Sequence, residues 1–114
     1  MALLSEYKAG NVSSFSVKTT TYTVALKDAA SVIALSGSSA ATTLSCVIPS
    51  NNFPAGFSFS VTRFGSSRVV FKPESDVIFR TAGVSYEIAS QYSIGSVVYS
   101  GVPANGWLVF GDLV

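Results

Sequence analysis

Along most of this chain, apolar and polar residues alternate with a period of two. The clearest example is the segment 57–63, in which Phe57, Phe59 and Val61 alternate with serine and threonine. Such alternation predicts half-buried β-strands, and no stretch shows the i, i+3, i+4, i+7 spacing of an amphipathic helix. Strands are predicted at residues 21–26, 31–36, 42–48, 57–63, 68–72, 76–80, 84–89, 96–100 and 106–110.

Short segments rich in glycine, serine, proline and asparagine separate these strands. Gly65-Ser66-Ser67 predicts a tight hairpin, whereas residues 49–56 form the longest loop and contain two prolines. Most connections have hairpin length, and the crossover helices that usually join parallel strands are absent from the pattern. The sequence therefore predicts an all-β fold, an antiparallel β-sandwich or jelly-roll-like domain of about eight or nine short strands.

Three apolar residues in loops and strands are predicted to belong to the core. Trp107, the only tryptophan, lies in the apolar run that ends the chain and is expected to anchor the last strand. Phe53 is expected to plug the edge of the core from the long loop. Cys46 alternates with apolar neighbours, which favours a buried thiol over a reactive one.

The first twenty residues differ from the rest because they show no clear alternation yet contain large apolar side chains. We divide the chain into an N-terminal arm at residues 1–20 and a single β-sandwich domain at residues 21–114. The arm is either a frayed terminus that adds a few residues as an edge strand or a segment that docks on a neighbouring subunit. In the docking hypothesis the contacts come from Leu3, Leu4, Tyr7, Val12, Phe15 and Val17.

Composition and charge narrow the possible partners. The chain has 114 residues, only 11% of them charged, and its formal net charge is +1. The charges are scattered singly, so no basic stripe indicates nucleic-acid binding. No apolar run approaches the roughly 20 residues of a membrane-spanning helix, and the N-terminus lacks the pattern of a signal peptide. Nucleic acid and membrane are therefore not expected partners.

The residues that carry chemistry are sparse. The chain has no histidine, which excludes a Ser-His-Asp triad and histidine-ligated metal sites. Glu74 and Asp76 are the one close acidic pair; a solvated turn is favoured there over glycosidic cleavage or calcium binding. Asp28 is expected to accept backbone N–H bonds in a turn. Trp107 and the tyrosines are expected to pack in the core or between subunits, with sugar stacking as the alternative. We expect no catalytic residue, cofactor or metal, and therefore no enzyme.

Seven pieces of the chain follow one another in a distinctive order. They are residues 22–26, Asp28-Ala29-Ala30, residues 42–49, Phe53-Pro54-Ala55-Gly56, Phe64-Gly65-Ser66-Ser67, Gln91-Tyr92-Ser93 and Trp107-Leu108-Val109-Phe110-Gly111-Asp112-Leu113. Their order resembles a β-domain found in tailed-bacteriophage virion proteins, in tail-fibre tips and head-surface proteins. The resemblance covers residues 22–113, and Ala30 stands where such domains usually carry glycine.

The resemblance implies a homotrimeric component of the virion surface, made in the cytoplasm of the bacterial host. A short arm on a compact body favours a capsid decoration (cement) protein or short head fibre that binds the major capsid protein or another virion protein. The alternative is a tail-fibre or receptor-binding tip that recognises host surface glycans.

Overall fold

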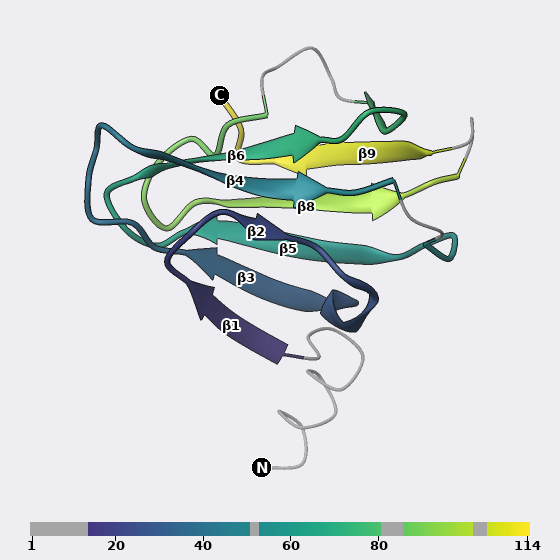
Figure 1. The fold of residues 1–114 in the computed structure, drawn as a ribbon, viewed down its shortest axis with the longest axis horizontal. Coiled ribbons are helices and arrows are strands. Elements are labelled where there is room, and N and C mark those ends of the chain that lie inside the picture. Colours follow the sequence, from purple (N-terminus) through teal and green to yellow (C-terminus); the bar gives the residue numbers. More distant parts are fainter. Residues whose placement is uncertain (1–13, 51–52, 81–85, 102–104) are drawn as a thin grey trace.

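The computed structural model describes residues 14–50, 53–80, 86–101 and 105–114, which form two layered β-sheets and almost no helix (Figure 1). The all-β prediction is therefore confirmed. Within these residues no helix is long and apolar enough to cross a lipid bilayer. The elements are β1 (Ser14–Lys18), β2 (Tyr22–Thr23), the 3-10 helix η1 (Leu26–Asp28), β3 (Ser31–Leu35), β4 (Thr43–Ile48), β5 (Ser58–Arg63), β6 (Arg68–Pro73), β7 (Ile78–Arg80), β8 (Ile94–Tyr99) and β9 (Gly106–Gly111).

The first six strands alternate between the two sheets. Strands β1, β3 and β5 lie side by side and parallel in the large sheet, whose order is β1-β3-β5-β8-β9-β7. Strands β2, β4 and β6 form the small sheet in the same way. Each turn of the chain thus adds one strand to each sheet, which is the path of a β-solenoid (Figure 1).

The predicted antiparallel pairing is wrong for most of the fold. Among the described strands, five of the seven pairings are parallel. The physical reason is that the chain reaches each parallel neighbour by crossing to the other sheet, so no crossover helix is needed. Alternation of side chains is the same in parallel and antiparallel strands, and the pattern alone does not separate them.

The predicted hairpin at residues 65–67 is wrong for the same reason. This turn carries the chain from β5 in the large sheet to β6 in the small one. It stacks on the equivalent corner after β3, because the backbone N–H groups of Ser66 and Ser67 donate to the carbonyl of Gly37 at 2.8 and 3.0 Å. A Cβ on Gly65 would lie 2.4 Å from that carbonyl oxygen, so this corner requires glycine.

The C-terminal part of the chain covers the end of the solenoid that follows β5 and β6. Strands β8 and β9 extend the large sheet with antiparallel pairings, and β7 adds a parallel edge strand beside β9. Of the strand predicted at residues 84–89, the described residues contribute isolated bridges rather than a strand. Glu87 bridges to Val70 on β6, and Ile88 bridges to Leu113.

The core fills the space between the two sheets. Trp107 is fully buried, with its ring 5.2 Å from that of Phe53, 6.1 Å from Phe57 and 5.1 Å from Tyr99. The predicted positions of Trp107 and Phe53 in the core are confirmed. The burial of this aromatic group ties the long loop and the last strand to the same core.

Candidate interaction surface

The two acidic residues singled out in the sequence lie in the turn between β6 and β7. Glu74 accepts a hydrogen bond from the backbone N–H of Ser50 through Oε1 at 3.4 Å. Asp76 adopts a φ of 76° in the turn before β7. Within the described residues, no group of three or more His, Cys, Asp or Glu side chains could hold a metal ion.

Asp28 stabilises the corner between β2 and β3. Its carboxylate is buried and accepts hydrogen bonds from the Ala25 N–H at 2.8 Å and from the Tyr22 hydroxyl at 2.8 and 3.1 Å. The expected hydrogen bond to the backbone is therefore present, and its donor is the N–H of Ala25, the N-cap residue of η1. Burial, followed by the hydrogen bond to Asp28 and the charge of that carboxylate, raises the pKa of Tyr22 to about 12. Tyr22 therefore stays protonated near neutral pH and acts as a structural donor.

The same corner contains Ala30, the position at which the sequence resemblance leads one to expect glycine. Ala30 adopts a φ of 55°, in the left-handed region that glycine occupies without cost. Its backbone N–H donates to the carbonyl of Ser58 at 2.8 Å, which holds the start of β3 against β5. The backbone conformation suited to glycine is thus retained here with alanine.

Two further candidates are buried beyond the reach of a ligand. Cys46 is fully buried in β4, as predicted, and burial raises the pKa of its thiol. A thiol in this state is a poor nucleophile. The complete burial of Trp107 also overturns the alternative that this ring stacks on a sugar.

The predicted docking residues fall partly outside the described part of the chain. Leu3, Leu4, Tyr7 and Val12 lie in residues 1–13, beyond the described ranges. Phe15 and Val17 lie in β1, where they are 55% and 52% exposed.

β1 pairs in parallel with β3 along its whole length, and the Oγ atoms of Ser14 and Ser31 are 2.8 Å apart. Ser14–Lys18 thus forms the strand at one edge of the large sheet, and whether it docks on another protein stays a prediction. The remaining residues of the arm and the boundary at residue 20 stay predictions.

The large sheet turns one face toward the core and the other away from it, and this outward face is mostly apolar. Among its described strand residues, Arg80 is the one charged side chain. Phe110 is 50% exposed, and other large residues on the face are similarly open to solvent. The apolar residues of the outward face are Phe15, Val17, Val32, Ala34, Ile94, Val98, Leu108, Phe110 and Ile78.

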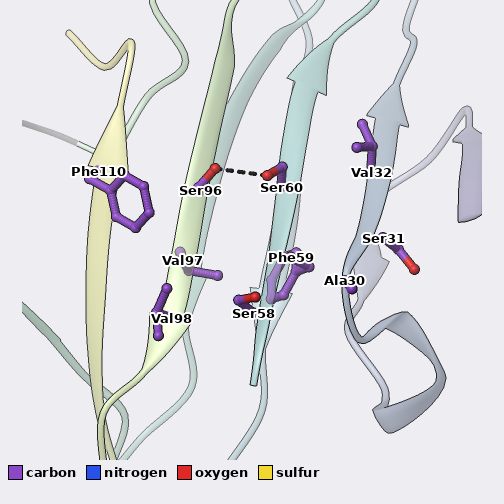
Figure 2. A pocket seen from close by; sticks show the side chains of 10 residues that line it. All are labelled: Ala30, Ser31, Val32, Ser58, Phe59, Ser60, Ser96, Val97, Val98 and Phe110. Atoms are coloured by element: carbon purple, nitrogen blue, oxygen red, sulfur yellow. Dashed lines mark hydrogen bonds between the residues drawn. The ribbon is translucent and has the colours of Figure 1, made fainter. Parts of the chain in front are cut away.

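A trough runs across the middle of the outward face. The register places Phe15, Val32, Ser60, Ser96 and Phe110 in one row across five strands, with large residues at the ends and serines in the centre. Figure 2 shows the two serines pointing toward each other; their Oγ atoms are 2.7 Å apart. The trough encloses about 150 Å³.

An aromatic cluster lies at one end of the same face. The ring of Phe64 is 6.0 Å from that of Phe15 and 5.6 Å from that of Tyr92, which is 65% exposed. Polar groups flank Tyr92 in sequence: Ser93 donates to Asp112 Oδ2 at 2.7 Å, and Gln91 Nε2 donates to the carbonyl of Phe64 at 3.3 Å.

Sequence reasoning missed most of this face. The signal was present in the run from Trp107 to Phe110, where two buried positions alternate with Leu108 and Phe110. A strand that is apolar on both faces is typical of one covered on both sides. No protein-family model, curated protein or solved structure matches this chain, so the surface itself must indicate the function.

Proposed function

We propose that this chain is a structural protein of a bacteriophage virion, a capsid decoration or short head-fibre protein that binds the outer surface of the major capsid shell and stabilises it. The observation that carries the proposal is the edge strand β1, which presents Phe15 and Val17 to solvent at the outer limit of the large sheet. The second support is the resemblance of residues 22–113 to β-domains of tailed-phage virion proteins.

An edge strand of this kind suits docking on another protein. β1 is the outermost described strand, and its side away from β3 offers backbone groups for strand addition. Phe15 and Val17 are about half exposed, so their complete burial would contribute about 0.8–1.5 kcal/mol each, half the value for a fully exposed side chain. Binding by apolar burial and strand addition needs little charge, which fits a net charge of +1.

The proposed role is binding rather than catalysis. Asp28 and Tyr22 are engaged in the η1 corner, and Cys46 is buried. The resemblance also implies a homotrimer, but binding to the head through β1 does not depend on how many copies of the chain associate. The chain would be made in the bacterial cytoplasm and added to a preformed shell.

Localisation in the intact virion tests this proposal. Antibody labelling viewed by electron microscopy is expected to decorate the whole head in many copies. Heads that lack the protein should bind the wild-type chain in co-sedimentation, and the Phe15→Ser/Val17→Ser variant should bind at least about tenfold more weakly. Leu26→Ser is the matched control, because Leu26 is 59% exposed but lies in η1. Label confined to the tail would contradict head decoration, and equal binding of heads by both variants would contradict docking through β1.

The alternative, a tail-fibre or receptor-binding tip that recognises host glycans, is favoured by one observation. Tyr92 is strongly exposed beside Gln91 and Ser93, and an aromatic ring flanked by hydrogen-bonding groups suits a sugar. In this alternative, a bacterial glycan array would capture the wild-type chain and lose Tyr92→Asn; asparagine suits the φ of 70° at this position. The alternative fails if no glycan is captured.

A further inference from the structure

We propose that the outward face of the large sheet binds the same face of a second copy of this chain, with Phe110 of each copy inserted into the trough of the other. The proposal does not rest on the virion role, because the surface involved is β3 to β7 across the sheet rather than the β1 edge. It commits the chain to a pair with twofold symmetry.

The shape of the face is self-complementary. Phe110 forms a ridge on β9, and the trough over Ser60 and Ser96 lies one to two strands away on β5 and β8 (Figure 2). A twofold axis parallel to the strands and above β8 places β9 of each copy over β5 of the other. The axis keeps the row of Ser60, Ser96 and Phe110 at one level, so each phenylalanine meets a serine trough. Sheets packed face to face lie about 10 Å apart with interdigitating side chains, which this alternation of ridge and trough allows.

The chemistry of the face permits its burial. The hydroxyls of Ser60 and Ser96 already bond each other at 2.7 Å, so they enter the interface with a partner. Buried polar groups that keep a hydrogen bond avoid the main cost of desolvation. Of the charged side chains on the described strands, Arg80 alone lies on this face; it is on β7 at the sheet edge, where its long stem can reach solvent.

The same arrangement leaves the docking strand uncovered. With the axis above β8, β3 lies over β7 of the second copy and β1 extends past the edge of the overlap. Phe15 and Val17 therefore remain available to another protein while Phe110 is buried in the pair. Pairing and head binding are separate properties of separate strands.

The contact area indicates a weak, reversible pair. Five overlapping strands about 4.8 Å apart and about five residues long cover roughly 400 Å² of each copy in flat projection. Total buried areas below about 1,200 Å² are typical of transient complexes. We therefore expect dissociation in the micromolar range for the isolated chain.

The pattern of residue sizes favours two copies over three. If three sheets faced a common threefold axis, the middle of each sheet would lie nearest the axis and large residues would be needed there to fill the centre. At the level of Phe110, the middle of this face contains Ser60 and Ser96 instead. Small residues at that position would leave the centre empty, at a cost in lost packing.

Sedimentation equilibrium of the purified full-length chain tests the pair. Between about 1 μM and about 1 mM we expect a monomer–dimer equilibrium. Phe110→Ser removes the same contact twice in a symmetric pair, so the dissociation constant should rise about tenfold per copy and about a hundredfold in all. Ser60→Tyr, which fills the trough from within, should have a similar effect. Circular dichroism of both variants checks that the sheets are retained.

Leu26→Ser is again the control, since it removes an equally exposed apolar side chain from η1, and its dissociation constant should equal that of the wild type. A monomer over the whole range, a trimer, or a dimer that both face variants leave intact would overturn the proposal. The sedimentation experiment contains no heads, so a negative result does not contradict the decoration role. A failure of head binding likewise does not contradict the pair.

Discussion

The two sheets of this molecule present outward faces of opposite character. On the large sheet the outward positions include Leu108 and Phe110, both about half exposed. On the small sheet they include Thr43, Arg68 and Lys72. Both faces are produced by the same alternation of side chains around one core, so alternation alone does not explain the difference. A face that stays polar is suited to water, whereas a large apolar face marks a contact with another protein.

The charged residues follow the same division. Arg68 on β6 makes two hydrogen bonds to Glu87, from Nε to Oε2 at 2.9 Å and from Nη2 to Oε1 at 2.6 Å. This pair holds the closing segment against the outer side of the small sheet. On the large sheet the equivalent central positions contain Ser60 and Ser96, which are uncharged and bond each other. The molecule thus has one polar outward face and one mostly apolar outward face.

The largest effect on stability is expected in the core, which the two sheets share. Trp107→Ala should lower the free energy of unfolding by about 3–5 kcal/mol, because it leaves a large cavity among buried aromatic rings. The adjacent substitution Leu108→Ala, on the outward face of the same strand, should change it by only about 0.5 kcal/mol. Denaturant unfolding followed by circular dichroism measures both. Equal losses would mean that the two faces of β9 are not distinct.

A smaller loss is expected when the inner face of β8 is overfilled. A Cβ on Gly95 would lie 2.7 Å from Cδ1 of Ile88 and 2.9 Å from Cε2 of Phe71, so Gly95→Ala should cost about 1–3 kcal/mol. Ser96→Ala on the outward face removes one hydroxyl bond and should cost about 1 kcal/mol or less. Thermal unfolding of the two variants compares them directly. A Gly95 variant as stable as the wild type would show that this side of β8 has spare room.

The ion pair on the small sheet should produce a modest dependence on pH. The hydrogen bonds from Arg68 lower the pKa of Glu87 in the folded state. The stabilisation is therefore present above the unfolded value of about 4.3 and is lost as the pH falls through the lower folded value. Because the pair is solvent-exposed, we expect at most about 1 kcal/mol, reduced by salt. Unfolding of the wild type and Glu87→Gln between pH 3 and 7 measures it; parallel curves would exclude this contribution.

The smallest change in stability, and the sharpest contrast in association, is expected from matched substitutions on the two outward faces. Ile94→Thr on the large sheet and Val47→Thr on the small sheet each keep a β-branched residue in an outward position. Both should alter the free energy of unfolding by about 0.5 kcal/mol or less. Only Ile94→Thr should weaken pairing in sedimentation equilibrium. Equal effects on association would mean that the faces do not differ in function.

Much of the strand content could be predicted from the sequence, because alternation such as that of Ser58–Arg63 reports burial directly. The pairing could not, since the alternation of Val32 or Leu44 is the same whether the neighbouring strand runs parallel or antiparallel. The strand Ser14–Lys18 is not predicted by the pattern, because its apolar residues Phe15 and Val17 face outward instead of into the core. The trough needs the register of five strands, which no local pattern contains.

The stacked corners limit which polypeptides can bind at the end of the solenoid formed by β1 and β2. At that end β1 and β2 are the outermost described strands of the two sheets, whereas β8, β9 and the bridge at Glu87 close the other end. A guest polypeptide that satisfies both open edges must lay one strand on each layer and bend between them, with a small residue at the bend as at Gly37 and Gly65. This end of the molecule would bind a two-stranded loop of one chain direction more tightly than it would bind any single extended peptide.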